Sequence, residues 1–419
     1  MCSPQVGPCH SRRARLTRTG RKPLARRSLG RCLIVNAYSY KNAGDAAIML
    51  STARLLRDLG AESVAIASRY DDGDAYGRLG LPVVPPVVAF PASGQGSRAV
   101  RLAVLLGASV KAIASIASHG KLGAKRLRGD YDTLVIAGGG YMYSSKRRFN
   151  MSLWHSLLSV KFGVAALRNV LMMPQSIGPI DRWLDRVVVE WALKDVSVVV
   201  REIRSLDASS REPHFDELHV VDDVAFYPGL EFGAPASRGK ATLRLVVMDW
   251  TWSRSVSAVR FERYVQQMAL LADLAAESGY EVVIGGHSSL GEHDQDDVQV
   301  ARRIQALSRS NPSVDTNTDV VHLYDEYSNA AIIVGTRLHS CIMALSVGTP
   351  AVGLSYQEKT PGVLAGIGHE EFVHSVDNFE PEVLMAQVRA LVTAPREHWV
   401  SLATQTRDSI YERYEELCQ

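Results

Sequence analysis

Three cationic side chains stand where two apolar runs near the end of the chain stop. Arg337 and His339 follow "AAIIVG" (330–335), and Lys359 follows "PAVGLSY" (350–356). A guanidinium is a rigid fork for a phosphate or carboxylate, and an ammonium adds a compact positive charge. A histidine with its usual pKa near ~6.5 can carry a proton at neutral pH. Because the three cations belong to neighbouring strand ends, we expect an anion site there rather than three separate salt bridges.

The loop "YSYKNAGDAAIM" (38–49) follows the first apolar run and contains Asn42, Gly44 and Asp45. Gly44 permits a tight backbone, and the N-terminus of the predicted helix offers free N–H groups to an anion or a sugar hydroxyl. An acid in the first turn also favours the helix dipole. Asp45 is therefore either a simple helix cap or a group that acts on the acceptor.

Three other strand ends carry glycines or polar side chains. The candidate residues at these ends are Gly139, Gly140, Tyr141, Gln175 and Arg201. The glycine spacing does not match the dinucleotide fingerprint, and the chain has no P-loop sequence. Arg201 either pairs with Glu202 or a neighbouring helix, or it binds an anion. Asp222 and Asp223 point in different directions on an extended chain, which favours a structural hydrogen bond for one of them over a shared metal ion.

The elements that must position these residues form two blocks. In the first, predicted strands lie at 32–38, 63–68, 132–138, 169–174, 196–200 and 218–223, and residues 44–59 show helical periodicity. In the second, predicted strands lie at 243–250, 280–286, 319–323, 330–335 and 350–356, and predicted helices at 261–279, 379–393 and 396–416. Apolar strands that alternate with helices predict parallel sheets covered on both faces.

The chain is therefore predicted to be an α/β protein with two doubly wound, Rossmann-like domains facing a cleft. We expect a basic, disordered head at 1–30, an N-terminal domain at 31–226, a linker at 227–242 and a C-terminal domain at 243–419. In open α/β sheets, ligands bind beyond the carboxyl ends of the strands, so the cleft is the expected site.

Read in order, "NAGDAAI", "AGGGYMYS", "PQSIGP", "DDVAF" and "GTRLHSCIMALSVGTPAVGLSYQEKTPG" resemble the polysaccharide pyruvyl transferase family. The resemblance spans roughly residues 32–366, and the last motif is the most specific. It implies a fold like that of GT-B glycosyltransferases. It also implies phosphoenolpyruvate as the donor, and a sugar of a cell-surface polysaccharide or glycolipid as the acceptor. The product would be a pyruvate ketal, formed without a metal or an organic cofactor.

Carried over by position, the family's functional residues fall on Gly44, Asp45, Arg201, Arg337, His339 and Lys359. The expected donor site consists of Arg337, His339, Ser340 and Lys359 of the C-terminal domain, together with Arg201 of the N-terminal domain. The expected acceptor side, in the N-terminal domain, consists of Asn42, Gly44, Asp45, Gly139, Gly140, Tyr141 and Gln175. Arg337, His339 and Asp45 are the candidate catalytic residues. Protonation of the donor's methylene carbon and deprotonation of the acceptor require a general acid and a general base.

Two other functions remain open at this stage. A GT-B glycosyltransferase that uses a nucleotide sugar would share the "GTPAV" element and would need a late carboxylate for the ribose, for which Glu358 is the candidate. A non-catalytic glycan-binding protein would leave the cation cluster unexplained. A thermal shift with phosphoenolpyruvate or with uridine nucleotides would distinguish the three.

Charge and cysteine content bear on the location of the protein. Residues 1–31 carry nine Lys or Arg residues and no acid, although the net charge of the whole chain is only +3. This basic head is either a solvated extension or a tail for anionic surfaces, and we expect no nucleic-acid partner. The five cysteines show no metal-ligand spacing and no disulfide framework, which favours the cytoplasm.

Residues 98–128 offer an apolar helix face with basic flanks. The segment is either a helix packed on the sheet or a peripheral contact with the anionic inner leaflet. The second interpretation would suit an acceptor carried by a lipid.

Overall fold

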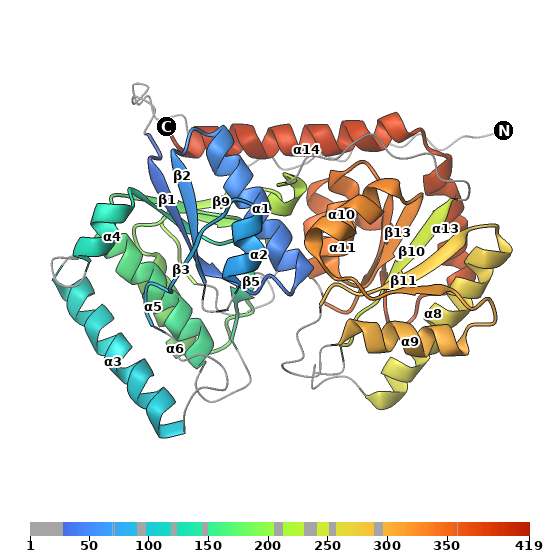
Figure 1. The fold of residues 1–419 in the computed structure, drawn as a ribbon, viewed down its shortest axis with the longest axis horizontal. Coiled ribbons are helices and arrows are strands. Elements are labelled where there is room, and N and C mark those ends of the chain that lie inside the picture. The colour runs from blue at the N-terminus through green and yellow to red at the C-terminus, as the bar shows by residue number, and fades with distance from the viewer. Residues whose placement is uncertain are drawn as a thin grey trace, which may run out of the picture.

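In the computed structural model, α/β elements form two halves joined by a long C-terminal helix (Figure 1). The structure describes residues 28–68, 70, 72–89, 98–118, 124–144, 150–204, 213–229, 241–250, 257–288, 296–357 and 359–419. Nearly all of the predicted head and most of the predicted linker lie outside these residues.

The N-terminal half is built on two parallel sheets. The first has the order β3-β2-β1-β4-β6, formed by β1 (Arg31–Ala37), β2 (Ser63–Ser68), β3 (Val83–Val84), β4 (Thr133–Ile136) and β6 (Asn169–Met172). The second has the order β5-β7-β8-β9, formed by β5 (Gly139–Met142), β7 (Gln175–Ile177), β8 (Val198–Val200) and β9 (Leu218–Val220). Residues 32–35 of β1 are all buried, as expected for a central parallel strand covered on both faces.

Helices cover this half from both sides. They are α1 (Ala43–Asp58), α2 (Gly73–Arg78), α3 (Arg98–Ala117), α4 (Lys125–Asp130), α5 (Met151–Ala166), α6 (Trp183–Leu193) and the short η1 (Val224–Phe226). In Figure 1, α1 and α2 lie toward the C-terminal half, and α3, α4, α5 and α6 lie on the far side. The cleft-facing helix of this half is therefore α1, which directly follows β1.

The C-terminal half is a single parallel sheet with the order β12-β11-β10-β13-β14-β15. Its strands are β10 (Thr242–Val246), β11 (Glu281–Gly285), β12 (Ser313–Asp315), β13 (Ile332–Gly335), β14 (Ala351–Ser355) and β15 (Val373–Ser375). Its helices are α8 (Ala258–Glu277), α9 (Asp297–Leu307), α10 (Val320–Asn329), α11 (Leu338–Ser346), α12 (Lys359–Gly366), η2 (Glu370–Phe372), α13 (Pro381–Thr393) and α14 (Arg396–Leu417).

The strand predicted at 319–323 is wrong, because these residues begin helix α10. Asp319 caps this helix: its carboxylate accepts hydrogen bonds from the backbone N–H groups of Val321 (2.9 Å) and His322 (3.4 Å). The apolar run that suggested a strand supplies the buried face of the helix, with Val320, Leu323, Tyr324 and Tyr327 all buried. The edge strand β12, just before it, was not predicted.

Contacts in two regions hold the halves together: one lies along helix α14 and the other near the N-terminus of helix α1. Helix α14 crosses from the C-terminal half to the N-terminal half (Figure 1), where the Tyr414 hydroxyl donates to the Met172 carbonyl over 2.8 Å. At the cleft, the Ala43 N–H donates to the His287 carbonyl over 2.9 Å. The Tyr40 hydroxyl donates to the Asp319 carboxylate over 3.0 Å, so the cap of α10 is also an interdomain contact.

Candidate active site

Two helices that follow central strands meet end to end across the cleft. Helix α1 begins after β1 and carries Gly44 and Asp45 in its first turn, whereas α11 begins after β13 with Arg337 as its N-cap and His339 in its first turn. A Cβ atom on Gly44 would lie 2.6 Å from Nδ1 and 2.8 Å from Cβ of His339. Gly44 is therefore needed because the histidine ring packs directly on the backbone of α1.

Arg337 is held by a buried carboxylate that the sequence did not single out. Its Nε and Nη2 atoms donate to Asp297 Oδ2 and Oδ1 over 3.0 and 2.8 Å. The same fully buried carboxylate accepts backbone N–H groups of Asp249 (3.1 Å), His287 (3.0 Å) and Ser288 (3.1 Å). Burial opposes the charge of Arg337, but the attraction of Asp297 outweighs it and raises the pKa of the guanidinium. The arginine is a fixed, permanent cation.

Arg201 is also paired, and its partner is Asp223. Its Nη1 atom donates to Asp223 Oδ2, and its Nε donates to the Ser176 hydroxyl over 2.8 Å. Burial opposes ionisation of Asp223, but Arg201 and then His339 outweigh it and hold the pKa of this carboxyl below its usual range. Asp223 has the structural role expected for one of the two aspartates, since its Oδ1 accepts the Ala225 N–H over 2.9 Å.

Asp223 also lies close to His339. The Nε2 atom of His339 is 3.7 Å from Asp223 Oδ2, and no hydrogen-bond partner for this nitrogen is found among the described residues. The separation is too long for a hydrogen bond but short enough for a strong charge interaction when the ring is protonated. The two side chains are therefore electrostatically coupled across the two halves of the protein.

Lys359 and Asp45 complete the cluster. Burial, together with the charges of Arg201 and Arg337, lowers the pKa of Lys359 to about 8. Within the described chain, the Lys359 ammonium makes no ion pair. Burial raises the pKa of Asp45 although His339, Lys359, Arg201 and Arg337 all act to lower it. The five groups are thus within electrostatic reach of one another, with Asp45 as the acid among four basic side chains.

The remaining predicted residues have mainly structural contacts. The Asn42 side chain accepts the Gly44 N–H over 3.1 Å, and the Ser340 hydroxyl donates to the Arg337 carbonyl over 2.6 Å. Both side chains shape a helix N-terminus, and buried Ser340 does not face the cleft.

On the acceptor side, Gly140 is the residue that reaches the cluster. A Cβ atom there would lie 3.2 Å from Nη2 of Arg201. Gly139 has a φ of 126°, which favours glycine. Gln175 is fully buried and donates to the Ala137 carbonyl, whereas the Tyr141 hydroxyl accepts from the Asn36 side chain over 3.3 Å. The contacts of Gln175 and Tyr141 stay within the N-terminal half.

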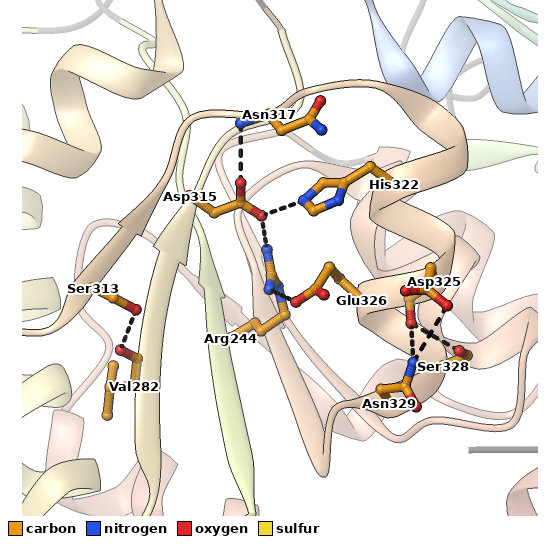
Figure 2. Close-up of polar contacts among 10 residues, drawn as sticks. All are labelled: Arg244, Val282, Ser313, Asp315, Asn317, His322, Asp325, Glu326, Ser328 and Asn329. Atoms are coloured by element: carbon orange, nitrogen blue, oxygen red, sulfur yellow. Dashed lines mark hydrogen bonds and ion pairs between the residues drawn. The ribbon is translucent and has the colours of Figure 1, made fainter. Parts of the chain in front are cut away.

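A second polar cluster lines a cavity of about 250 Å³. Figure 2 shows the polar contacts of this cluster. Buried Arg244 pairs there with Asp315 and, over 2.6 Å, with Glu326. His322 Nε2 lies 2.9 Å from Asp315 Oδ2. Since two carboxylates already neutralise the one guanidinium, this cluster fixes α10 against the sheet rather than offering an anion site.

Comparison with known proteins assigns the family. A profile described as polysaccharide pyruvyl transferase matches residues 42–358, about three quarters of the chain. The chain belongs to the polysaccharide pyruvyl transferase family. Members of this family are transferases that act on polysaccharides, and the matched region contains every predicted site residue except Lys359, which follows its last position.

One relative and two solved structures illustrate what this chain is similar to. The amylovoran biosynthesis protein AmsJ of Erwinia amylovora is 22% identical over 280 residues, which cover 62% of this chain and 66% of AmsJ, just under two thirds of its length. The UDP-GlcNAc 2-epimerase of Neisseria meningitidis shares the fold with a TM-score of 0.51 at 12% identity, covering 93% of this chain and 98% of that one. A glycotransferase of kitacinnamycin has a TM-score of 0.48 at 14% identity, covering 94% and 98% of the two chains. The parallel sheets of the two halves, together with the likeness to the epimerase, confirm the predicted GT-B-like fold of two Rossmann-like domains.

Two further findings concern the described residues alone. No group of three or more His, Cys, Asp or Glu side chains among them is arranged to hold a metal ion. No helix in the described part of the chain has the length and apolar character needed to cross a bilayer. Glu358, the candidate ribose ligand of a nucleotide-sugar enzyme, lies outside the described residues.

Proposed function

We propose that this protein transfers the enolpyruvyl group of phosphoenolpyruvate to a sugar of a cell-surface polysaccharide or glycolipid. The product is a pyruvate ketal, and phosphate is released. The observation that carries this proposal is the convergence of Arg337, His339, Lys359 and Asp45 where the N-termini of α1, α11 and α12 meet. Family membership supports a transferase acting on polysaccharide.

The donor fits the charges of the cluster. Phosphoenolpyruvate carries a phosphate and a carboxylate, and both need cations in a site sheltered from water. Arg337 is oriented by Asp297, so its remaining donors are fixed in place, and Lys359 is a cation that makes no ion pair within the described residues. Backbone N–H groups at the starts of α11 and α12 add further donors for the phosphate. These groups supply the positive charge that the donor requires, so we propose no metal ion and no organic cofactor.

His339 is suited to be the general acid. The ring faces the first turn of α1, where the acceptor would enter, and its Nε2 atom lies 3.7 Å from the Asp223 carboxylate, with no hydrogen-bond partner among the described residues. A proton from His339 passes to the methylene carbon of the donor, which leaves an oxocarbenium-like centre at the neighbouring carbon. One sugar hydroxyl then forms a C–O bond to this centre and loses its proton to a base.

Asp45 is suited to be that base. Burial raises its carboxyl pKa toward a value useful for accepting a proton, and the adjacent cations stabilise its charged form. The C–O bond to phosphate then breaks, and the second sugar hydroxyl closes the ketal with loss of its own proton. The overall reaction converts donor and diol into ketal and inorganic phosphate, so its atoms balance.

The experiment is to incubate purified protein with phosphoenolpyruvate and a panel of galactosides, glucosides and mannosides. Mass spectrometry should detect a product heavier by one pyruvate less one water, with equimolar phosphate released. A thermal shift with uridine nucleotides but none with phosphoenolpyruvate would favour a nucleotide-sugar glycosyltransferase. Binding of glycan without turnover of any donor would favour a non-catalytic role.

The proposal also includes a place for the reaction. We infer that the enzyme works in the cytoplasm on an acceptor carried by a lipid, in peripheral contact with the anionic inner leaflet. Its product would remain at that leaflet for export.

A further inference from the structure

Helix α3 exposes an apolar stripe that no described part of the chain covers. Leu106, Val110 and Ile113 are 58%, 66% and 56% exposed. Their spacing of four and three residues places them on one line along the helix. The opposite side of the helix is also apolar and is buried at Ala112, so α3 is apolar on two faces, unlike an ordinary surface helix.

Helix α6 carries a second stripe of the same kind. Trp183 is 62% exposed, and Val187 and Trp191 follow at intervals of four residues, both exposed. Tryptophan is enriched where proteins meet the interface of a bilayer.

The two stripes belong to one layer of three helices. Both α3 and α6 pack against α5, and Figure 1 shows the three at the outer edge of the N-terminal half. Buried Asp185 of α6 fixes this arrangement, because it accepts the Trp154 indole N–H over 2.7 Å and the Ser144 hydroxyl over 2.8 Å. Trp154 and Leu158 of α5 are half-buried and pack against the hydrophobic core. We call the six stripe residues Leu106, Val110, Ile113, Trp183, Val187 and Trp191 the outer apolar surface.

Lysines border this surface. Lys111 is exposed on α3, Lys194 follows α6, and the Lys161 ammonium lies 5.9 Å from the ring centroid of Trp191. Residues 98–130 contain seven Lys or Arg residues and one acid, whereas the chain outside this segment and outside residues 1–31 has a net charge of −12. Helix α3, with its exposed apolar stripe, thus lies in the one basic segment of a chain that is otherwise acidic after residue 31.

The structure assigns the outer apolar surface to docking on an anionic lipid bilayer. Apolar side chains with tryptophans and a lysine border suit the headgroup boundary, and each basic residue near such a surface adds attraction that salt screens. A second copy of this chain would bring like charges together. Helices α5 and α6 follow β5 and β7, the strands that carry Gly139, Gly140, Tyr141 and Gln175 of the expected acceptor side. The inference rests on the proposed function in one respect: a lipid-linked sugar would enter the candidate active site from the side of the outer apolar surface.

The test is co-sedimentation of the full chain with vesicles of phosphatidylglycerol and phosphatidylcholine, and with phosphatidylcholine alone. We expect binding to the anionic vesicles that weakens at high salt. Val110→Ser with Ile113→Ser, and separately Trp183→Ser with Val187→Ser, should each weaken it about tenfold. The matched control is Val259→Ser with Val383→Ser, which removes exposed apolar side chains from α8 and α13 of the other half and should leave binding unchanged.

Several outcomes would overturn the assignment. The first is that the protein binds neutral vesicles as well as anionic ones. The second is that binding is lost only when residues 1–27 are deleted. The third is that the protein forms a dimer in solution that the Val110→Ser, Ile113→Ser variant dissociates. If a serine variant unfolds, the Lys111→Gln, Lys194→Gln double variant tests the docking independently. It should reduce the salt-sensitive part of the vesicle binding. Vesicle binding does not require turnover, so a failure of pyruvyl transfer and a failure of docking are separate results.

Discussion

Replacing Asp297 by asparagine should test how the donor site is built. One carboxylate oxygen accepts Nη2 of Arg337 (2.8 Å) and the Asp249 N–H (3.1 Å). The other accepts Nε of Arg337 (3.0 Å) and the N–H groups of His287 (3.0 Å) and Ser288 (3.1 Å). Whichever way the introduced amide is turned, its NH₂ group faces at least two donors, and the guanidinium loses its counter-charge.

The expected cost follows from this geometry. Removing one partner of a buried ion pair typically destabilises a protein by about 3–5 kcal/mol. Urea unfolding should therefore show a loss of this size for Asp297→Asn. Calorimetry should show weaker phosphoenolpyruvate binding under conditions where the variant is folded, because Arg337 is no longer oriented.

The neighbouring Asp296→Asn variant is the matched control. Asp296 caps α9 through the Val298 N–H over 3.0 Å, a role that asparagine also fills, so stability and donor affinity should hardly change. If Asp297→Asn unfolds at the same urea concentration as the control and binds the donor equally well, the positioning role of this carboxylate is refuted.

Further predictions concern the cations, the interdomain contact and metals. Phosphoenolpyruvate affinity should fall as pH rises through about 8, because Lys359 then loses its proton, and Lys359→Arg should abolish this dependence; a calorimetric pH series with no break near 8 would contradict the assignment. Gly44→Ala should displace the His339 ring and lower turnover about 100-fold, since the new Cβ would lie 2.6 Å from Nδ1, whereas Gly73→Ala, with nothing within 4 Å, should be neutral. Equal turnover of the two glycine variants would show that the contact is unimportant. Turnover should survive exhaustive chelation, and a loss that a single divalent ion restores would oppose metal-free chemistry.

The described structure shows which local patterns are informative. The mainly apolar runs at 63–68 and 330–335 contain strands β2 and β13 of the parallel sheets, and the 44–59 periodicity is helix α1. The run at 319–323 was misassigned because a short apolar segment does not distinguish a strand from the buried face of a helix. The capping side chain of Asp319 was the signal that would have decided it.

In the candidate site, too, some features follow from the sequence and others only from the tertiary structure. Arg337, His339 and Lys359 stand out because parallel strands bring their carboxyl ends to one edge, so residues after β13 and β14 must be neighbours. The pairing of Arg201 with Asp223 rather than Glu202 did not follow from the sequence, nor did Asp297 as the partner of Arg337, 40 residues away. Adjacent acids at 296–297 and 222–223 carry no spacing that indicates which of them turns inward.

By itself, therefore, the sequence determined the α/β class, the two blocks of parallel strands and the cationic strand ends, because these depend on local periodicity and on a general property of parallel sheets. Only the tertiary structure decided which charges are neutralised, that Gly44 packs on His339, and that α3 and α6 together leave an apolar face uncovered. These features depend on contacts between segments far apart in the chain, where packing rather than local pattern selects the partner of each side chain.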